Sequence, residues 1–150
     1  METKLLPPVK VLYYSTQTTL KTLGEYVLNI AKQLYTESAR LDLLPTGPIY
    51  WLYYGADGNP DTIFTLEIAL PVNHTPIRAS IFKYKVLPAF NCIDTVHYGK
   101  WETLPATYQK LIPQIMTNGH ALSGFTREVY LNIDLNHPQY NITQVQVGVA

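Results

Sequence analysis

The residues best suited to chemistry lie on a short strand predicted near the C-terminus, over 127–132. The two-residue period of a strand places Glu128 and Tyr130 on one face and directs Val129 and Leu131 the other way, toward the predicted helices. A carboxylate among aromatic rings suits a lipophilic cation, because each ring adds apolar area and a cation–π attraction of roughly 0.5–2 kcal/mol. The strand pattern is equally compatible with a Glu128 that faces solvent beside the preceding arginine.

The sequence contains a second aromatic segment like the one around Glu128, and we interpret the two segments as equivalent parts of a repeated folding unit. Trp51 and Tyr53 precede Glu128 and Tyr130 by the same 77 residues. If the two copies pair symmetrically, these four side chains face one another across a cleft between the halves. Such a junction is a common place for a ligand, so the four residues form the predicted ligand site.

Two predicted helices also recur, with a constant offset of 81 residues. Leu20, Leu23, Val27, Ile30 and Leu34 correspond to Trp101, Leu104, Tyr108, Leu111 and Ile115. Spacings of three and four are typical of an amphipathic helix, which we predict over 19–36 and again over 100–117. Trp101 lies on the apolar stripe of the second predicted helix, which favours a position in the core. We expect that it could also contact the ligand.

Strands are predicted from runs of β-branched and aromatic residues at 9–15, 49–54, 62–70, 81–86, 91–98, 127–132 and 142–149. The order is strand-helix-strand-strand, twice, with an extra strand near residue 81. This predicts one α+β domain over 1–150, built from pseudo-repeats at about 9–72 and 81–150 that a pseudo-two-fold axis relates. A mainly antiparallel sheet would carry the two helices and leave a central groove. Glu67, in the strand over 62–70, is expected to face outward.

Composition excludes several classes of function. Eleven basic and 11 acidic residues give a formal net charge of zero, whereas nucleic-acid binding needs a basic face. No apolar run approaches the roughly 18 residues of a membrane helix, and the first residues are too interrupted for a signal peptide. The single cysteine, Cys92, suits a reducing compartment. We therefore expect a cytoplasmic domain that binds neither nucleic acid nor membrane by itself.

Metal and cofactor chemistry finds no support in the motifs. The four histidines are scattered singly, without ligand spacing or a cysteine partner. No phosphate-binding loop, dinucleotide fingerprint or nucleophile elbow occurs. We expect no metal and no cofactor, and we expect His97 to lie on a strand and to bond its neighbours.

Several segments together resemble a known family. They are Leu87-Pro88-Ala89, His97-Tyr98-Gly99, the run 101–108, and Gly124 with 127–132. In this order they resemble the GyrI-like small-molecule-binding domain, a module also found at the C-terminus of multidrug-sensing transcription activators. Gly47-Pro48 with Tyr53, and the run 66–72, are similar to that family as well.

The resemblance implies a duplicated, SOUL-like fold with a central hydrophobic groove. It also implies that a buried Glu on the penultimate strand, ringed by aromatics, binds cationic ligands, and that position matches Glu128. The expected function is therefore a stand-alone effector-type binding domain. Its ligand contacts would be Glu128, Tyr130, Trp51, Tyr53 and Trp101.

Two other functions follow from the resemblance. Some stand-alone relatives are credited with hydrolysing cyclopropane-containing compounds, in which case Glu128 would be the catalytic residue, and another relative interferes with DNA gyrase. Phe90 in place of a usual Gly, and Lys100 in place of a common Pro, leave the ligand class open. We favour a binding protein over an enzyme. We expect no transcription regulation by this chain alone, because it has no room for a helix-turn-helix domain. We leave the assembly open between a monomer and a homodimer.

Overall fold

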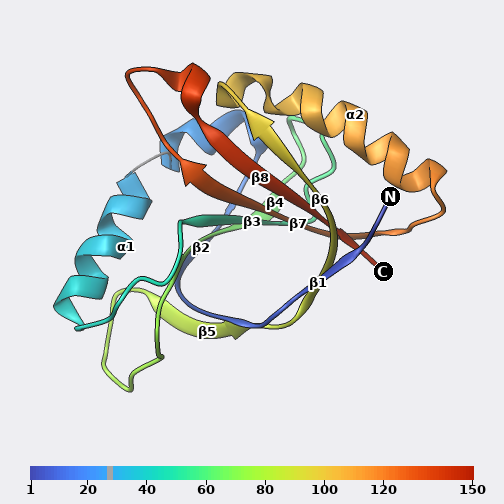
Figure 1. Cartoon of the computed structure of the whole chain (residues 1–150). Coiled ribbons are helices and arrows are strands. Elements are labelled where there is room, and N and C mark those ends of the chain that lie inside the picture. The colour runs from blue at the N-terminus through green and yellow to red at the C-terminus, as the bar shows by residue number, and fades with distance from the viewer. Residues whose placement is uncertain (27–28) are drawn as a thin grey trace.

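An eight-stranded antiparallel sheet, curled into a half-barrel, forms the frame of the molecule (Figure 1). The structure is a computed structural model that describes residues 1–26 and 29–150. The strands are β1 (Lys4–Leu6), β2 (Val9–Thr18), β3 (Tyr50–Tyr54), β4 (Phe64–Pro71), β5 (Lys83–Leu87), β6 (Phe90–Tyr98), β7 (Leu122–Asn132) and β8 (Ile142–Val149). They are ordered β1-β6-β8-β7-β3-β4-β2-β5 across the sheet. The predicted α+β class with a mainly antiparallel sheet is confirmed.

The strand order is symmetric about the centre of the sheet, where β3 pairs with β7. Trp51 lies directly opposite Glu128 in that pair. These two residues are also equivalent positions of the repeat, so a pseudo-two-fold axis relating the halves passes between them. The strand predicted as an extra one is β5, and its counterpart in the strand order is β1, which pairs with β6 and was not predicted. The strand β1 has only three residues and is followed by two prolines, so it is too short to show the alternation that identifies a strand in the sequence.

The helices α1 (Asn29–Arg40) and α2 (Leu104–Thr117) lie on the outer face of the curled sheet (Figure 1). A 3₁₀ segment precedes each of them, η1 (Leu20–Tyr26) and η2 (Trp101–Thr103). The prediction of one helix over 19–36 is therefore wrong in its bounds. Gly24 lies within η1, and the low helix propensity of glycine disfavours a continuous α-helix there. Val27, which belongs to the recurring pattern, lies outside the described residues.

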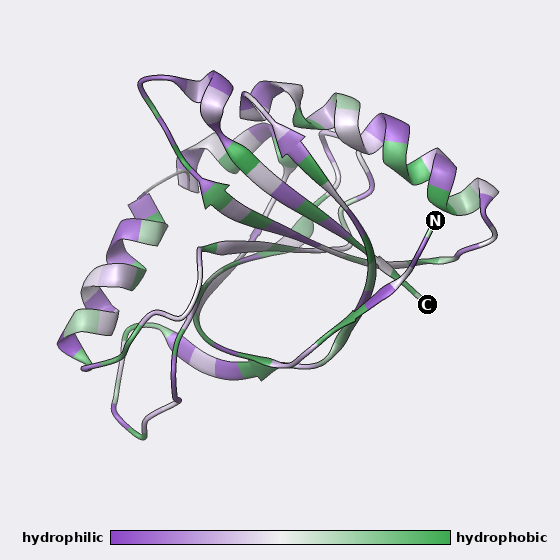
Figure 2. Cartoon of the chain, in the orientation of Figure 1, coloured by the Kyte–Doolittle hydropathy of each residue, from purple (hydrophilic) through white to green (hydrophobic). Residues whose placement is uncertain are grey.

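Both faces of the central strands are buried. Apolar and polar residues alternate along β7 and β8 (Figure 2), yet β4 is buried at nearly every position. On the outer face, α1 packs with a cluster that includes Leu12, Trp51 and Ile68, and α2 packs with one that includes Ile93, Val145 and Val147. The inner face lines the inside of the curl, where Val11, Leu52, Ala69 and Leu87 form a third cluster.

Because both faces of the sheet are covered, the predicted position of Glu67 differs from the observed one. It was expected to face outward, but it is buried on the inner face of β4 and forms an ion pair with Lys85 of β5. The prediction is wrong because the sheet curls, which places β5 next to β2 and covers the inner face.

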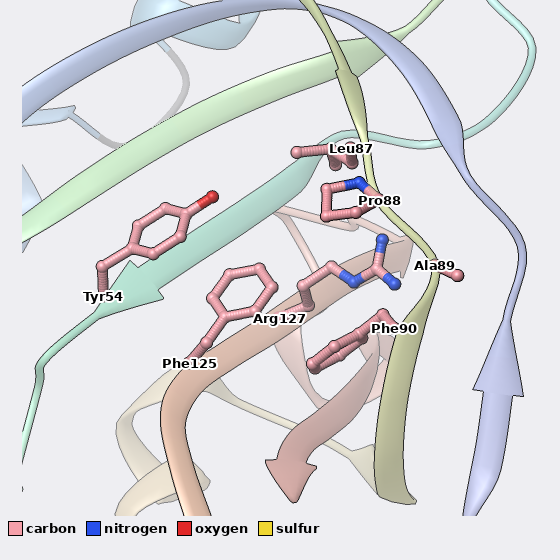
Figure 3. Close-up of a pocket in the computed structure, with 7 residues that line it drawn as sticks. All are labelled: Tyr54, Leu87, Pro88, Ala89, Phe90, Phe125 and Arg127. Atoms are coloured by element: carbon pink, nitrogen blue, oxygen red, sulfur yellow. The ribbon is translucent and has the colours of Figure 1, made fainter. Parts of the chain in front are cut away.

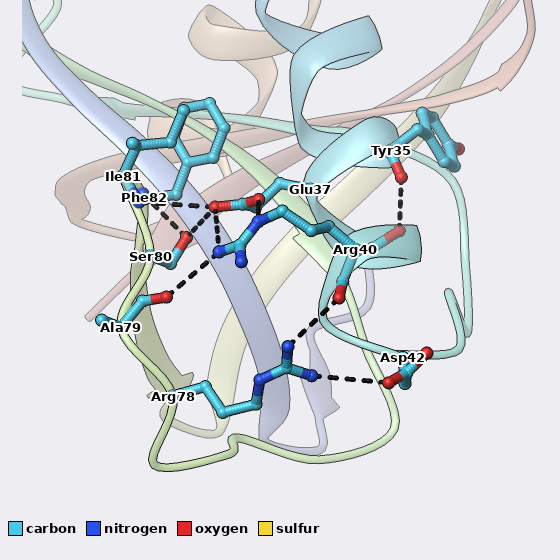
Figure 4. A network of polar contacts seen from close by, with 10 residues as sticks. Tyr35, Glu37, Arg40, Asp42, Arg78, Ala79, Ser80, Ile81 and Phe82 are labelled. Atoms are coloured by element: carbon cyan, nitrogen blue, oxygen red, sulfur yellow. Dashed lines mark hydrogen bonds and ion pairs between the residues drawn. The ribbon is translucent and has the colours of Figure 1, made fainter.

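A polar network ties the end of α1 to the segment between the two halves (Figure 4). Ser80 Oγ donates to Glu37 Oε2 at 2.6 Å. Arg40 Nη2 donates to Glu37 Oε2 at 3.2 Å and to the Ala79 carbonyl oxygen at 3.1 Å. This network holds α1 against the chain that leads into β5.

The network predicts a pH dependence of stability. Hydrogen bonds from Arg40 and Ser80 lower the pKa of Glu37 from 4.5 to about 2. A carboxyl whose pKa is lower in the folded state stabilises the fold fully above its unfolded pKa, and this contribution is lost as the pH falls from 4.5 toward 2. Glu37→Gln should cost about 1.5–3 kcal/mol at pH 7, the usual range for hydrogen bonds to a charged group. Urea unfolding at several pH values measures both effects.

The variant should also show a weaker loss of stability between pH 4.5 and 2 than the wild type. Glu2→Gln, which alters an exposed carboxyl, is the matched control and should keep the wild-type profile. An identical acid limb in Glu37→Gln and the wild type would contradict this role of the network.

Among the described residues, no helix has the length and apolarity needed to cross a membrane.

Candidate ligand site

Glu128 lies at the centre of the sheet, on β7, and its side chain is buried with 4% of the residue exposed. It shares the outer face of the sheet with Trp51 and Val145, its partners on the neighbouring strands, and so points toward the helices. The alternative of a solvent-facing Glu128 does not hold. The prediction that Val129 and Leu131 face the helices is wrong: Val129 is buried on the inner face, and Leu131 is exposed. Alternation separates the two faces of a strand but does not say which face carries the helices.

Three tyrosine hydroxyls donate hydrogen bonds to the Glu128 carboxylate. Tyr53 of β3 and Tyr130 of β7 donate to Oε1 at 2.9 and 2.6 Å, and Tyr108 of α2 donates to Oε2 at 2.6 Å. Tyr53 and Tyr130 belong to the predicted site. Tyr108 was missed as a site residue, although a hydroxyl within an apolar helix stripe was a signal available in the sequence.

The electrostatics of this cluster keep the three phenols protonated. Burial, and then the charge of Glu128, raise the pKa of Tyr53, Tyr108 and Tyr130 well above the ordinary value. Within residues 1–26 and 29–150, Glu128 forms no ion pair with a Lys, Arg or His. Neutral O–H donors therefore bond the carboxylate, and none of the described Lys, Arg or His residues pairs with it.

Two indole rings pack against Tyr130, one of the three tyrosines that bond Glu128. Trp51 and Trp101 both meet the Tyr130 ring edge-on, with centroids 5.9 and 5.7 Å away. Trp101 also packs against the α2 core cluster, so its core position and its contact with the site coexist. Its Nε1 is buried and has no hydrogen-bond partner within the part of the chain that the structure describes. The structure thus brings together all five residues predicted for the site.

His97 fixes the start of the helix that supplies Tyr108. The ring lies near the end of β6, where Nε2 contacts the Lys100 carbonyl oxygen at 3.0 Å and Nδ1 contacts Thr107 Oγ1 at 2.7 Å. A neutral imidazole can donate to the first and accept from the second. The prediction that His97 lies on a strand and bonds its neighbours is confirmed.

A hollow of about 470 Å³ opens beside this cluster, between α1 and β7. Its lining includes Ala31 and Tyr35 of α1, Pro48 and Ile49 ahead of β3, and Tyr130 of β7, which bonds Glu128. Glu128 itself does not line the hollow. Where a central groove was predicted, aromatic side chains therefore contact the carboxylate, and the hollow is lined by Tyr130 and not by Glu128.

A family model identifies the family, and solved structures share the fold. A family model described as a GyrI-like small-molecule binding domain matches residues 1–150. A search of curated proteins found no match. The crystal structure of the EcmrR C-terminal domain is similar to this chain with a TM-score of 0.81 and 20% identity, over 99% of this chain and 96% of that one. In a cryo-EM structure of an EcmrR–DNA complex the match covers 56% of the EcmrR chain, so this chain spans just over half of that protein.

Two further solved structures carry chemical information in their descriptions. SAV2435, described as bound to tetraphenylphosphonium, has a TM-score of 0.68 and 11% identity, over 99% of this chain and 93% of that one. A hydrolase encoded by lin2189 of Listeria innocua has a TM-score of 0.67 and 14% identity, over 99% and 91%. At these identities the similarity shows the fold alone.

Proposed function

This chain belongs to the family of GyrI-like small-molecule binding domains, and we propose from that premise that it binds lipophilic cations at Glu128. One observation carries the proposal: among the described residues, the buried Glu128 carboxylate accepts hydrogen bonds from three neutral phenols and pairs with no cation. Burying a charge is costly unless a partner compensates it. A ligand cation would supply the missing counter-charge.

The surrounding rings favour an apolar cation over a small hydrated one. Three tyrosines bond the carboxylate through their hydroxyls, and the rings of Trp51 and Trp101 pack against one of them, Tyr130. Aromatic rings attract a desolvated organic cation and add apolar contact area. A strongly hydrated metal ion would lose its water shell without gaining the several oxygen ligands it needs.

Access to the carboxylate depends on Tyr130. Tyr130 lines the hollow along α1, and its hydroxyl donates a hydrogen bond to Oε1 of Glu128. We infer that a ligand enters from the hollow, turns the Tyr130 side chain aside and replaces its hydrogen bond with an electrostatic contact. Tyr53 and Tyr108 would continue to orient the carboxylate. The description of SAV2435 as bound to tetraphenylphosphonium makes this cation the natural probe.

Tryptophan fluorescence provides the test, because the chain contains two tryptophans and both contact Tyr130. Titration with tetraphenylphosphonium chloride should give a saturable change in emission. Triphenylphosphine oxide, which is neutral and similarly aromatic, should bind at least about tenfold more weakly, a difference of about 1.4 kcal/mol. Equal affinities would show that the site recognises aromatic area rather than charge.

Hydrolysis with Glu128 activating a water molecule is the alternative function. Its structural requirement is a carboxylate oxygen that is open to water next to a bound substrate. In this structure both oxygens accept phenol hydroxyls, so turnover would need the same displacement of Tyr130 that we propose for binding. Incubation with strained cyclopropane esters, followed by product analysis, separates the two functions.

A further inference from the structure

Arg127 is a buried cation that forms no ion pair with any residue in 1–26 or 29–150. It is 1% exposed and lies on the inner face of β7, opposite to the face that carries Glu128. Neither Nε nor Nη2 has a hydrogen-bond partner anywhere in the described residues. An arginine is almost never fully buried unless it is paired. A buried guanidinium with two nitrogens that lack partners is therefore unusual and calls for a compensating group.

The strands on either side of Arg127 supply no acid. Its cross-strand neighbours are Leu52 on β3 and Gln146 on β8. The next residues along the same row are Glu67 and Asp94, and both are already bound. Glu67 pairs with Lys85, while Asp94 accepts from Lys4 Nζ at 3.0 Å and from Gln144 Nε2 at 2.7 Å.

Aromatic rings near Arg127 replace only part of the attraction that an anionic partner would provide. Cζ of Arg127 lies 4.3 Å from the centroid of the Phe90 ring and 5.5 Å from that of Tyr50. These contacts hold the guanidinium plane but accept no N–H group. Burial lowers the pKa of Arg127 from its ordinary value, as expected where no anion offsets desolvation.

A hollow of about 240 Å³ adjoins the guanidinium (Figure 3). Arg127 extends into it from β7, beneath the turn that joins β5 to β6. The other lining residues are Tyr54, Leu87, Pro88, Ala89, Phe90 and Phe125. Apart from the Tyr54 hydroxyl, their side chains are apolar. The volume lies below the roughly 300–1,000 Å³ of pockets for drug-sized ligands.

We propose that this hollow is a second ligand site, which binds a small organic monocarboxylate with an apolar body. Nε and Nη2 form one side of the guanidinium fork, which matches the two oxygens of a carboxylate through parallel N–H···O bonds. Both atoms are buried beside the hollow, so the ligand would have to move an adjoining apolar side chain to reach them. The apolar walls would cover the body of the ligand. A dianion such as phosphate fits poorly, because apart from Arg127 the lining holds no second cation.

Benzoate is the probe, and benzamide is its neutral counterpart of the same shape. Isothermal titration at constant ionic strength should show benzoate binding at least tenfold more tightly than benzamide. Arg127→Met should lose at least tenfold in benzoate affinity, and Arg127→Lys should lose nearly as much, because an ammonium group cannot form the two parallel bonds. Inorganic phosphate should compete only weakly.

Three results would overturn this proposal: no binding of benzoate, equal binding of benzamide, or unchanged benzoate affinity in Arg127→Met. Tighter binding of phosphate than of benzoate would replace the carboxylate class with another anion. Arg127→Met should fold, because it removes an unpaired buried charge and keeps an apolar stem, and circular dichroism checks this.

The two sites lie on opposite faces of the sheet, so their tests are independent. Glu128→Gln should retain benzoate binding, and Arg127→Met should retain tetraphenylphosphonium binding. Loss of both ligands in either variant would indicate a folding defect rather than the loss of one site. Unfolding curves for both variants identify that case.

Discussion

Glu128→Gln is expected to weaken tetraphenylphosphonium binding about 100-fold. The substitution keeps the shape of the side chain and removes the negative charge that we assign as the ligand's partner. Truncating one member of a buried charge pair costs roughly 2–5 kcal/mol, and about 2.7 kcal/mol corresponds to 100-fold in affinity. Fluorescence titration of the two tryptophans measures the change directly.

The neutral ligand and a distant carboxyl provide the controls for this result. Triphenylphosphine oxide should bind wild type and Glu128→Gln with similar affinity, because it carries no charge for the carboxylate to attract. Glu2→Gln removes one negative charge at an exposed position beside the edge strand β1, and should leave cation affinity unchanged. Equal losses in Glu2→Gln and Glu128→Gln would assign the effect to net charge and not to the site.

The tyrosine cluster predicts the second large effect, on stability. Tyr53→Phe and Tyr108→Phe each remove a hydrogen bond to a buried carboxylate, on a different oxygen. Each should cost about 1.5–3 kcal/mol of unfolding free energy, because the donor lost was bonded to a charged group. The double variant should lose more than either single variant, and up to roughly 3–6 kcal/mol if the two losses add at the shared carboxylate, a large part of the stability of a domain this size.

A double-mutant cycle assigns that loss to the carboxylate. In a Glu128→Gln background the same tyrosine substitutions should cost about 1 kcal/mol or less each, because the bonds now go to a neutral amide. Tyr35→Phe, which alters an exposed tyrosine of α1 that lines the hollow, is the matched control and should be near neutral. Equal costs in the two backgrounds would show that the tyrosines stabilise the fold without acting through Glu128.

The repeat in the sequence predicted the fold class and the way in which the two halves meet. A constant offset between two aromatic segments indicated that one folding unit occurs twice, and symmetric pairing placed Trp51 against Glu128. This worked because the two halves meet at β3 and β7, which lie next to each other at the centre of the sheet. The strand β1 was missed because it is stabilised by pairing with β6 rather than by a pattern of its own.

Which face each residue occupies could not be predicted as well. Alternation along a strand separates two sets of residues, but it identifies the core face only when the other face is solvated. In this curled sheet both faces are covered, so Val129 and Glu67 were assigned to the wrong surroundings. The burial of Arg127 and the bond from Tyr108 depend on the curl and on helix placement, which local patterns do not encode.

A crystal structure of the protein with tetraphenylphosphonium tests the central claim most directly. The proposed function requires the phosphonium centre to lie beside the Glu128 carboxylate, between the Trp51 and Trp101 rings, with Tyr130 turned away and its hydrogen bond broken. A cation resting in the outer hollow along α1, with Glu128 still bonded to all three tyrosines, would contradict it.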